Sequence, residues 1–177
     1  MFLSQAQLDL DRAYYGGVPG VFVSGLVWLT AGTVAYLSEG YLHLLVFFFG
    51  GMLIHPLGLV IARTLGASGR TAPDNPLGGL ALEVTVFLFA GLFVAWVVYH
   101  LRPDWFYPTM LVVIGARYVT FHTLYGNRAY WLLGGVLLAL GGVALLTLQP
   151  IHLPALAGGG IELVFAIAMA FGRSRRR

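Results

Sequence analysis

The sequence contains no cysteine and no lysine, and only 10% of its residues are charged. The absence of cysteine excludes disulfides, thiolate nucleophiles and cysteine-ligated metal sites. The absence of lysine excludes Schiff-base chemistry, including a retinal linkage, because that chemistry needs a primary amine. All ten basic residues are arginines, and an arginine side chain stays protonated in nearly any surroundings.

Apolar residues, in contrast, make up 59% of the 177 residues, and the mean hydropathy is +0.84. A soluble domain cannot bury that much apolar surface, so we expect lipid to surround most side chains. The net charge of +3 is concentrated in the C-terminal "GRSRRR", which suits the anionic inner leaflet of a membrane. No basic surface pattern with interleaved aromatics accompanies that tail, so we expect no binding of nucleic acid.

Six stretches reach the length of about 20 mostly apolar residues that a helix needs to cross a bilayer. They predict an all-α, polytopic membrane protein in which residues 1–177 form one domain with six transmembrane helices. The predicted spans are about 17–37, 41–65, 76–101, 104–126, 128–148 and 152–172. The polar stretch "GASGRTAPDNP" separates the second span from the third, and its Asn75-Pro76 pair is typical of a helix start.

The first 16 residues lack the basic region of a secretory signal, and Asp9 and Asp11 interrupt them. Leu3, Ala6 and Leu10 recur at helical spacing. We interpret residues 1–16 as a short helix lying in the membrane interface, with a disordered segment as the alternative.

Arginines distribute unequally about the six predicted spans, which place both termini on one side. Eight arginines fall on that side, including the basic tail 173–177, whereas the other side carries Arg102 alone. The positive-inside rule therefore predicts cytoplasmic N- and C-termini. The eight are Arg12, Arg63, Arg70, Arg128, Arg173, Arg175, Arg176 and Arg177.

Two short similarities suggest internal repetition. "PLGGLALEV" opens the third span and "PALAGGGIELV" the sixth, with Glu83 and Glu162 in matching places, while "FGGML" in the second span resembles "LGGVL" in the fifth. Because three spans are an odd number, the two repeats would be inverted in the membrane. Chance similarity between glycine-rich helices is the alternative.

Glycines on the second and fifth spans recur one heptad apart, as Gly134 and Gly141 illustrate. Small residues let helix backbones approach closely, which is how helices associate in lipid. These faces predict helix packing within the chain and a homo-oligomer as a further use of the same surfaces, with membrane lipids as the other contacts.

Five ionisable residues from four predicted spans fall in the inner half of the bilayer: His55, Glu83, Arg117, His122 and Glu162. A charge near mid-membrane costs about 3 kcal/mol or more unless it is paired or hydrated. We therefore expect Arg117 to pair with a carboxylate, and its depth favours Glu162.

This group is the predicted substrate-binding or ion-binding site, and Tyr118 joins it through the helical face that it shares with His122. A structural role is the alternative, because a buried Arg–Glu pair can fix which helices pack together. No His-x-x-x-His or Glu-x-x-His spacing, no Gly-x-Ser-x-Gly and no phosphate-binding glycine loop occurs, so neither a metal nor a cofactor is predicted.

The strings "SGLVWLTAG", "FFFGGMLIHPLG", "NPLGGLALEVT" and "RYVTFHTLYGNRAYW" resemble a family of small bacterial six-span membrane proteins classed as a domain of unknown function. The resemblance covers nearly the whole chain. It implies a multi-pass protein of the cell inner membrane, and it supplies no catalytic residue because the family has no assigned activity.

Three functional hypotheses follow from the residues. The first is a small transporter or channel for an ion or an anionic solute that uses the polar intramembrane site. The second is a membrane scaffold or accessory subunit in which the Arg–Glu pair is structural. The third is a membrane-embedded enzyme acting on a lipid, with Glu83 and His122 as acid and base.

Overall fold

The computed structural model describes residues 1–147 and 149–174, which form seven α-helices, two short 3-10 segments and no strand. Leu148, at the predicted end of the fifth span, and the tail residues 175–177 lie outside the described residues. The α-helices are α1 (Leu3–Ala13), α2 (Val18–Leu37), α3 (Leu42–Thr64), α4 (Leu77–Leu101), α5 (Phe106–Tyr125), α6 (Ala129–Thr147) and α7 (His152–Ser174). The 3-10 segments are Tyr15–Gly17, before α2, and Pro103–Trp105, before α5.

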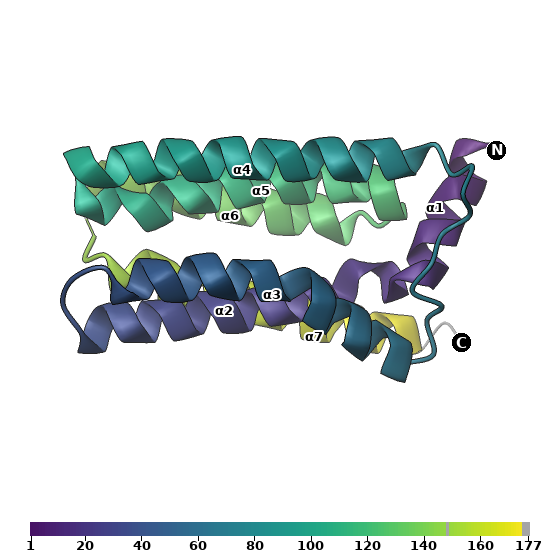
Figure 1. The fold of residues 1–177 in the computed structure, drawn as a ribbon, viewed down its shortest axis with the longest axis horizontal. Coiled ribbons are helices and arrows are strands. Elements are labelled where there is room, and N and C mark those ends of the chain that lie inside the picture. Colours follow the sequence, from purple (N-terminus) through teal and green to yellow (C-terminus); the bar gives the residue numbers. More distant parts are fainter. Residues whose placement is uncertain (148, 175–177) are drawn as a thin grey trace.

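Local sequence signals account for several helix ends. Gly17 takes a left-handed conformation before α2, and Gly126 takes the same conformation where α5 ends. Asn75 accepts the N–H of Leu77 at 2.9 Å where α4 begins, as the Asn-Pro pair predicts. Pro56 lies inside α3, and Figure 1 shows that helix changing direction in its second half.

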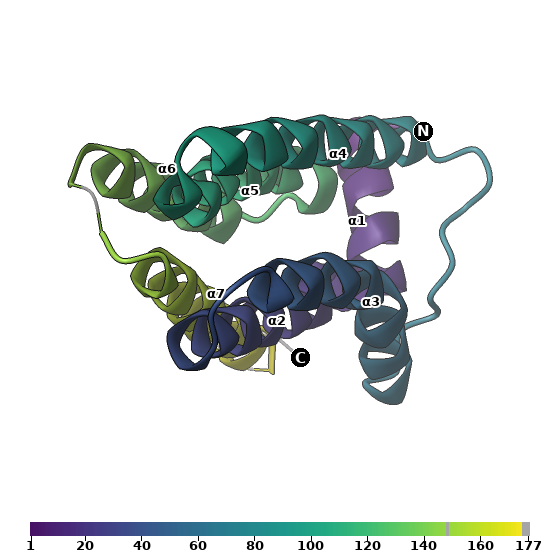
Figure 2. The same ribbon diagram turned by 60° about the vertical axis from the view of Figure 1, so that its left-hand side comes forward.

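The six long helices form two groups of three, which Figures 1 and 2 show one above the other. In one group α2 packs against both α3 and α7, and in the other α5 packs against both α4 and α6. The two groups meet where α7 contacts α5 and α6, whereas α3 and α4, both described in full, are not packed on each other. The groups also meet near the start of α3, where the Nδ1 atom of His43 lies 3.0 Å from the hydroxyl oxygen of Tyr107 on α5.

Five helical segments are long and apolar enough to cross a membrane: α3, α4, α6, α7 and the stretch Tyr15–Leu37 that includes α2. α5 has 20 residues, yet it does not belong to this set, because polar side chains such as Arg117 and His122 lower its mean hydropathy. α5 contacts α4, α6, α7 and α1. α5 therefore has more helical neighbours than the other long helices. Because these neighbours cover it, less of its surface has to be apolar.

α1 crosses the end of the molecule at which both chain termini lie (Figure 1). Its buried side chains Ala6 and Leu10 pack with Leu77 of α4 and Leu124 of α5. The Asn75 side chain donates to the carbonyl of Ala6 at 3.0 Å, which fixes α1 to the segment that leads into α4. Residues 3–13 thus form an ordered helix that closes one end of the helix bundle.

Glycines lie where the long helices approach most closely. A Cβ on Gly25 of α2 would lie 3.0 Å from the carbonyl oxygen of Gly159 of α7, and one on Gly134 of α6 would lie 2.6 Å from that of Gly115 of α5. A Cβ on Gly135, the next residue of α6, would meet no atom within 4 Å. One face of the glycine pattern therefore serves packing inside the chain, and the other points outward.

Replacing Gly134 by alanine should destabilise the protein by about 1–3 kcal/mol, because the new methyl group would overlap the α5 backbone. Gly135→Ala is the matched control. It adds the same methyl group to the same helix in open space, and alanine favours the helix by up to about 1 kcal/mol. Thermal unfolding in neutral detergent measures both, and equal melting temperatures for the two variants would contradict the α5–α6 contact.

The docking of α1 should weaken in acid. Hydrogen bonds from the Asn75 side chain and the Ala72 N–H hold the pKa of Asp9 below its ordinary value. The stabilisation that they give is present above the ordinary carboxyl pKa of about 4 and is lost as the pH falls below it. Amide hydrogen exchange, corrected for intrinsic rates, should show α1 opening more readily at pH 3 than at pH 5. An Asp9→Asn variant should show a smaller pH dependence, because the Asp11–Arg173 pair also holds α1, and an equal response in both proteins would refute the assignment.

Candidate functional site: a cavity between the helix groups

A cavity of about 640 Å³ lies between the two helix groups. That volume falls within the range of about 300–1,000 Å³ that is typical of ligand pockets. Its wall is mostly apolar, and α2, α3, α4 and α5 all contribute to it. The apolar lining includes Val21, Trp28, Phe47, Leu88, Met110 and Ile114. The polar lining residues are Ser24, His55, Thr85, Arg117 and Tyr118, with the hydroxyl-bearing rings of Tyr14 and Tyr125.

The cavity reaches the outer surface of the protein between α3 and α4. Phe48 and Met52 of α3 and Leu82 and Phe89 of α4 line the cavity and are also exposed. These two helices do not pack on each other beside these residues, and they approach near the start of α3, where the ring centroid of Tyr99 of α4 lies 6.2 Å from that of His43. At the end where the termini lie, Leu10 of α1 forms part of the lining and α1 covers the cavity.

Arg117 lies in the wall of this cavity, on α5, and is partly buried. Its guanidinium carbon lies 5.3 Å from the centroid of the Phe121 ring, a cation–π distance. Its Nε atom is buried without a hydrogen-bond acceptor, and no carboxylate of the described chain lies within 4.0 Å of its side chain. The positive charge of Arg117 therefore lies in a mostly apolar wall, beside the Phe121 ring and without a carboxylate of the described chain in contact.

Glu162 of α7 is fully buried, with 0% exposure. Its carboxyl group interacts with the hydroxyl groups of Ser24 on α2 and Tyr118 on α5. It also interacts, over a greater distance, with the charge of Arg117. Neither carboxyl oxygen has a partner at hydrogen-bond geometry. Because Ser24 and Tyr118 line the cavity and Glu162 does not, the carboxyl group lies behind the cavity wall.

The predicted direct pair between Arg117 and Glu162 is therefore wrong. In residues 1–147 and 149–174 the ion pair within 4.0 Å is Arg173 with Asp11. The physical reason is the angle of about 100° between consecutive side chains around a helix. Tyr118 points toward the α7 side of α5, where Glu162 lies, whereas Arg117 points into the cavity.

The other predicted site residues divide between the cavity and the outside. His55 stands at the cavity mouth on α3, its ring centroid 6.4 Å from that of Tyr14. Glu83 is exposed on α4 and does not line the cavity. His122 also lies away from it, with its ring centroid 4.2 Å from that of Trp131 on α6. The structure thus gathers Arg117, Tyr118 and His55 around one space.

Family comparison covers almost the whole molecule. The model of a family of unknown function, DUF7010, matches residues 3–172. The chain belongs to this family. Membership confirms the resemblance to a domain of unknown function, and the match includes α1 and the six long helices as far as the last turn of α7. No curated protein and no solved structure matches the chain.

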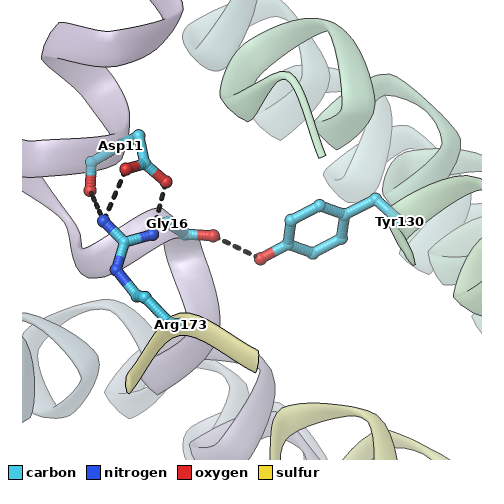
Figure 3. Close-up of polar contacts among 4 residues, drawn as sticks. All are labelled: Asp11, Gly16, Tyr130 and Arg173. Carbon is cyan, nitrogen blue, oxygen red and sulfur yellow. Dashed lines mark hydrogen bonds and ion pairs between the residues drawn. The ribbon is translucent and has the colours of Figure 1, made fainter. Parts of the chain in front are cut away.

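Sequence reasoning missed two polar contacts that hold the covered end of the cavity (Figure 3). The Arg173 guanidinium donates to both carboxylate oxygens of Asp11 and, at 3.2 Å, to its carbonyl oxygen. The Tyr130 hydroxyl donates to the carbonyl of Gly16 at 2.6 Å. One signal could have found the Asp11–Arg173 pair. Asp11 lies in the predicted N-terminal helix and Arg173 directly after the last predicted span, and both fall on the same predicted side of the membrane.

Ser24 was also missed, because a serine without an adjacent base carries no motif. His43, at the start of α3, is 4% exposed, and its Nδ1 lies 3.0 Å from the hydroxyl oxygen of Tyr107. That contact belongs to the core at the opposite end of the helices. Among the described residues no three His, Asp or Glu side chains gather closely enough to hold a metal ion.

Glu162→Gln tests the absence of a direct ion pair. The change removes the charge and keeps the shape, so we expect a melting temperature equal to or above that of the wild type, because neither carboxyl oxygen loses a bond. Arg173→Gln breaks the observed pair with Asp11 and should cost about 1–2 kcal/mol. Thermal unfolding in detergent compares the two, and a loss in Glu162→Gln as large as that in Arg173→Gln would overturn this description.

Proposed function

We propose that the chain is a six-span integral protein of the cell inner membrane that transports an ion or anionic solute through the cavity between its two helix groups. The observation that carries the proposal is the unpaired Arg117 in the wall of that cavity. An intramembrane charge is expensive, and such charges usually mark a substrate or ion pathway.

α5 is the sixth span in this proposal. Its 20 residues suffice to cross the hydrocarbon core, and it lies alongside α4 and α6 in Figures 1 and 2. Its polar side chains are tolerated because neighbouring helices and the cavity surround them. The N- and C-terminal ends lie at the same end of the molecule (Figure 1), and the arginine excess at that end supports cytoplasmic termini.

The grouping of the helices supports two inverted repeats, α2–α4 and α5–α7. Each repeat would contribute its first two helices to one group and its third helix to the other, because α7 packs on α2 and α4 packs on α5. This exchange of the third helix gives two similar groups of three helices with a site between them. Alternating access in transporters proceeds by the movement of one such body against the other around a fixed site.

Each of the two other hypotheses lacks one contact that it used. An acid–base pair of Glu83 and His122 is not assembled, because Glu83 is exposed on α4 and His122 packs toward α6. A scaffold held by a structural Arg117–Glu162 pair does not fit either, since the two side chains do not meet.

Proteoliposomes with an entrapped pH-sensitive dye test transport. Under an imposed potential the wild type should carry a proton flux, alone or coupled to an anion, above that of empty liposomes. Arg117→Ala and Glu162→Gln should lower the flux at least about tenfold, which corresponds to about 1.4 kcal/mol of lost interaction. Glu83→Gln is the matched control, because it makes the same chemical change at an exposed position of α4 and should leave the flux unchanged.

An equal flux in the wild type, Arg117→Ala and Glu162→Gln would reject the transport proposal. So would a loss in Glu83→Gln as large as that in Glu162→Gln, because that result would show a general effect of removing carboxylates. Elution of each variant as a single species from gel filtration establishes that it is folded before reconstitution.

A further inference from the structure

We infer that the cavity binds a single-chain amphiphile with an anionic head, which enters from the lipid through the gap between α3 and α4. The inference rests on the proposed function, since it names the class of the substrate. It follows from three features of the cavity: its wall, its opening and its charge.

The wall suits an apolar chain. Trp28 is 1% exposed in the structure as a whole, and Phe47, Met110 and Ile114 beside it are likewise buried core residues that line the cavity. Water filling such a space would find few hydrogen-bond partners, because ordered water in a protein needs two to four of them. A hydrocarbon tail would satisfy this wall without leaving a polar group unpaired.

The opening faces lipid. The cavity reaches the surface between two helices that are each apolar enough to cross a membrane. At the end near the chain termini α1 is held across the cavity by Asp11–Arg173 and by Asn75, so the route from that aqueous side is covered. A molecule already dissolved in the bilayer therefore has the most direct path into the cavity.

The charge selects the head. Arg117 lines the cavity and has neither a carboxylate within 4.0 Å nor an acceptor for its Nε atom. A guanidinium binds carboxylate and phosphate groups through two parallel hydrogen bonds. An anionic head at Arg117 would neutralise this charge, with the tail extending along the apolar wall that includes Trp28.

Fluorescence of Trp28 measures the binding directly. Trp28 lines the cavity, whereas Trp96, Trp105 and Trp131 do not, so their replacement by phenylalanine leaves one reporter at the site. The probe is a dibrominated octadecanoate in neutral detergent micelles, because bromine quenches tryptophan fluorescence on contact. The dibrominated octadecanol carries the same tail without the charge, and the dibrominated octadecyl phosphate carries the same tail with a phosphate head in place of the carboxylate.

We expect both anionic probes to quench Trp28 at lower concentrations than the alcohol. Arg117→Gln should weaken quenching by the anions at least about tenfold and leave quenching by the alcohol unchanged, while Arg117→Lys should restore part of the loss. Arg102→Gln is the matched control, because it removes a positive charge from an exposed position outside the cavity, and it should leave both affinities unchanged.

A steric variant tests the cavity independently of charge. Gly51 lines the cavity, and a Cβ added there would meet no atom within 4 Å, so Gly51→Leu should fill part of the space and weaken quenching by every probe. Gly135→Leu is its control, because Gly135 has the same free space outside the cavity. Equal quenching in Gly51→Leu and Gly135→Leu would place the probes elsewhere.

The inference is overturned if the anions and the alcohol lose affinity equally in Arg117→Gln. It is also overturned if every probe quenches Trp28 only at concentrations at which that probe forms micelles of its own. These results are distinct from a failure of transport. Head-dependent binding without flux in liposomes would leave a lipid-binding protein and reject the transporter. Flux without binding of these probes would keep the transporter and reject the amphiphile as its substrate.

Discussion

Contact between helix backbones at glycine is the constraint on which this structure depends. Five of the six long helices are apolar enough to cross a membrane, and in lipid such helices gain little from burying apolar side chains, so close van der Waals contact would hold them together. Gly25 and Gly159 supply that contact between α2 and α7, and Gly115 and Gly134 supply it between α5 and α6. Each group of helices is built around such a pair, and the space between the groups is what this tight packing leaves.

That space determines where charge can be placed. Arg117 projects from α5 into the cavity, whereas Glu162 projects from α7 against Ser24 and Tyr118 and never reaches it. The two side chains are close enough to act on each other through their charges and too far apart to pair. A group that occupied the cavity could therefore neutralise Arg117 while Glu162 stayed within the helix packing.

Hydropathy and glycine spacing predict the six long helices to within a few residues, because length and composition are properties of each helix alone. Contacts between helices are harder, because the position of a residue along its span gives its depth but not its direction. Glu83 and His122 fall with Arg117 in the inner half of the predicted bilayer, yet they do not line the cavity. The ion pair of Asp11 with Arg173 joins residues 162 positions apart, so only the shared side of the membrane hinted at it.

The pairing of α2 with α7 has a consequence for biosynthesis. α2 leaves the ribosome first among the long helices, and the helix that covers Gly25 leaves last. The glycine face of α2, and Asp11 before it, therefore have no partner until translation is nearly complete. A nascent chain that stops before His152 would leave the glycine face of α2 without its partner helix, so the packing of the first long helix depends on completion of the last.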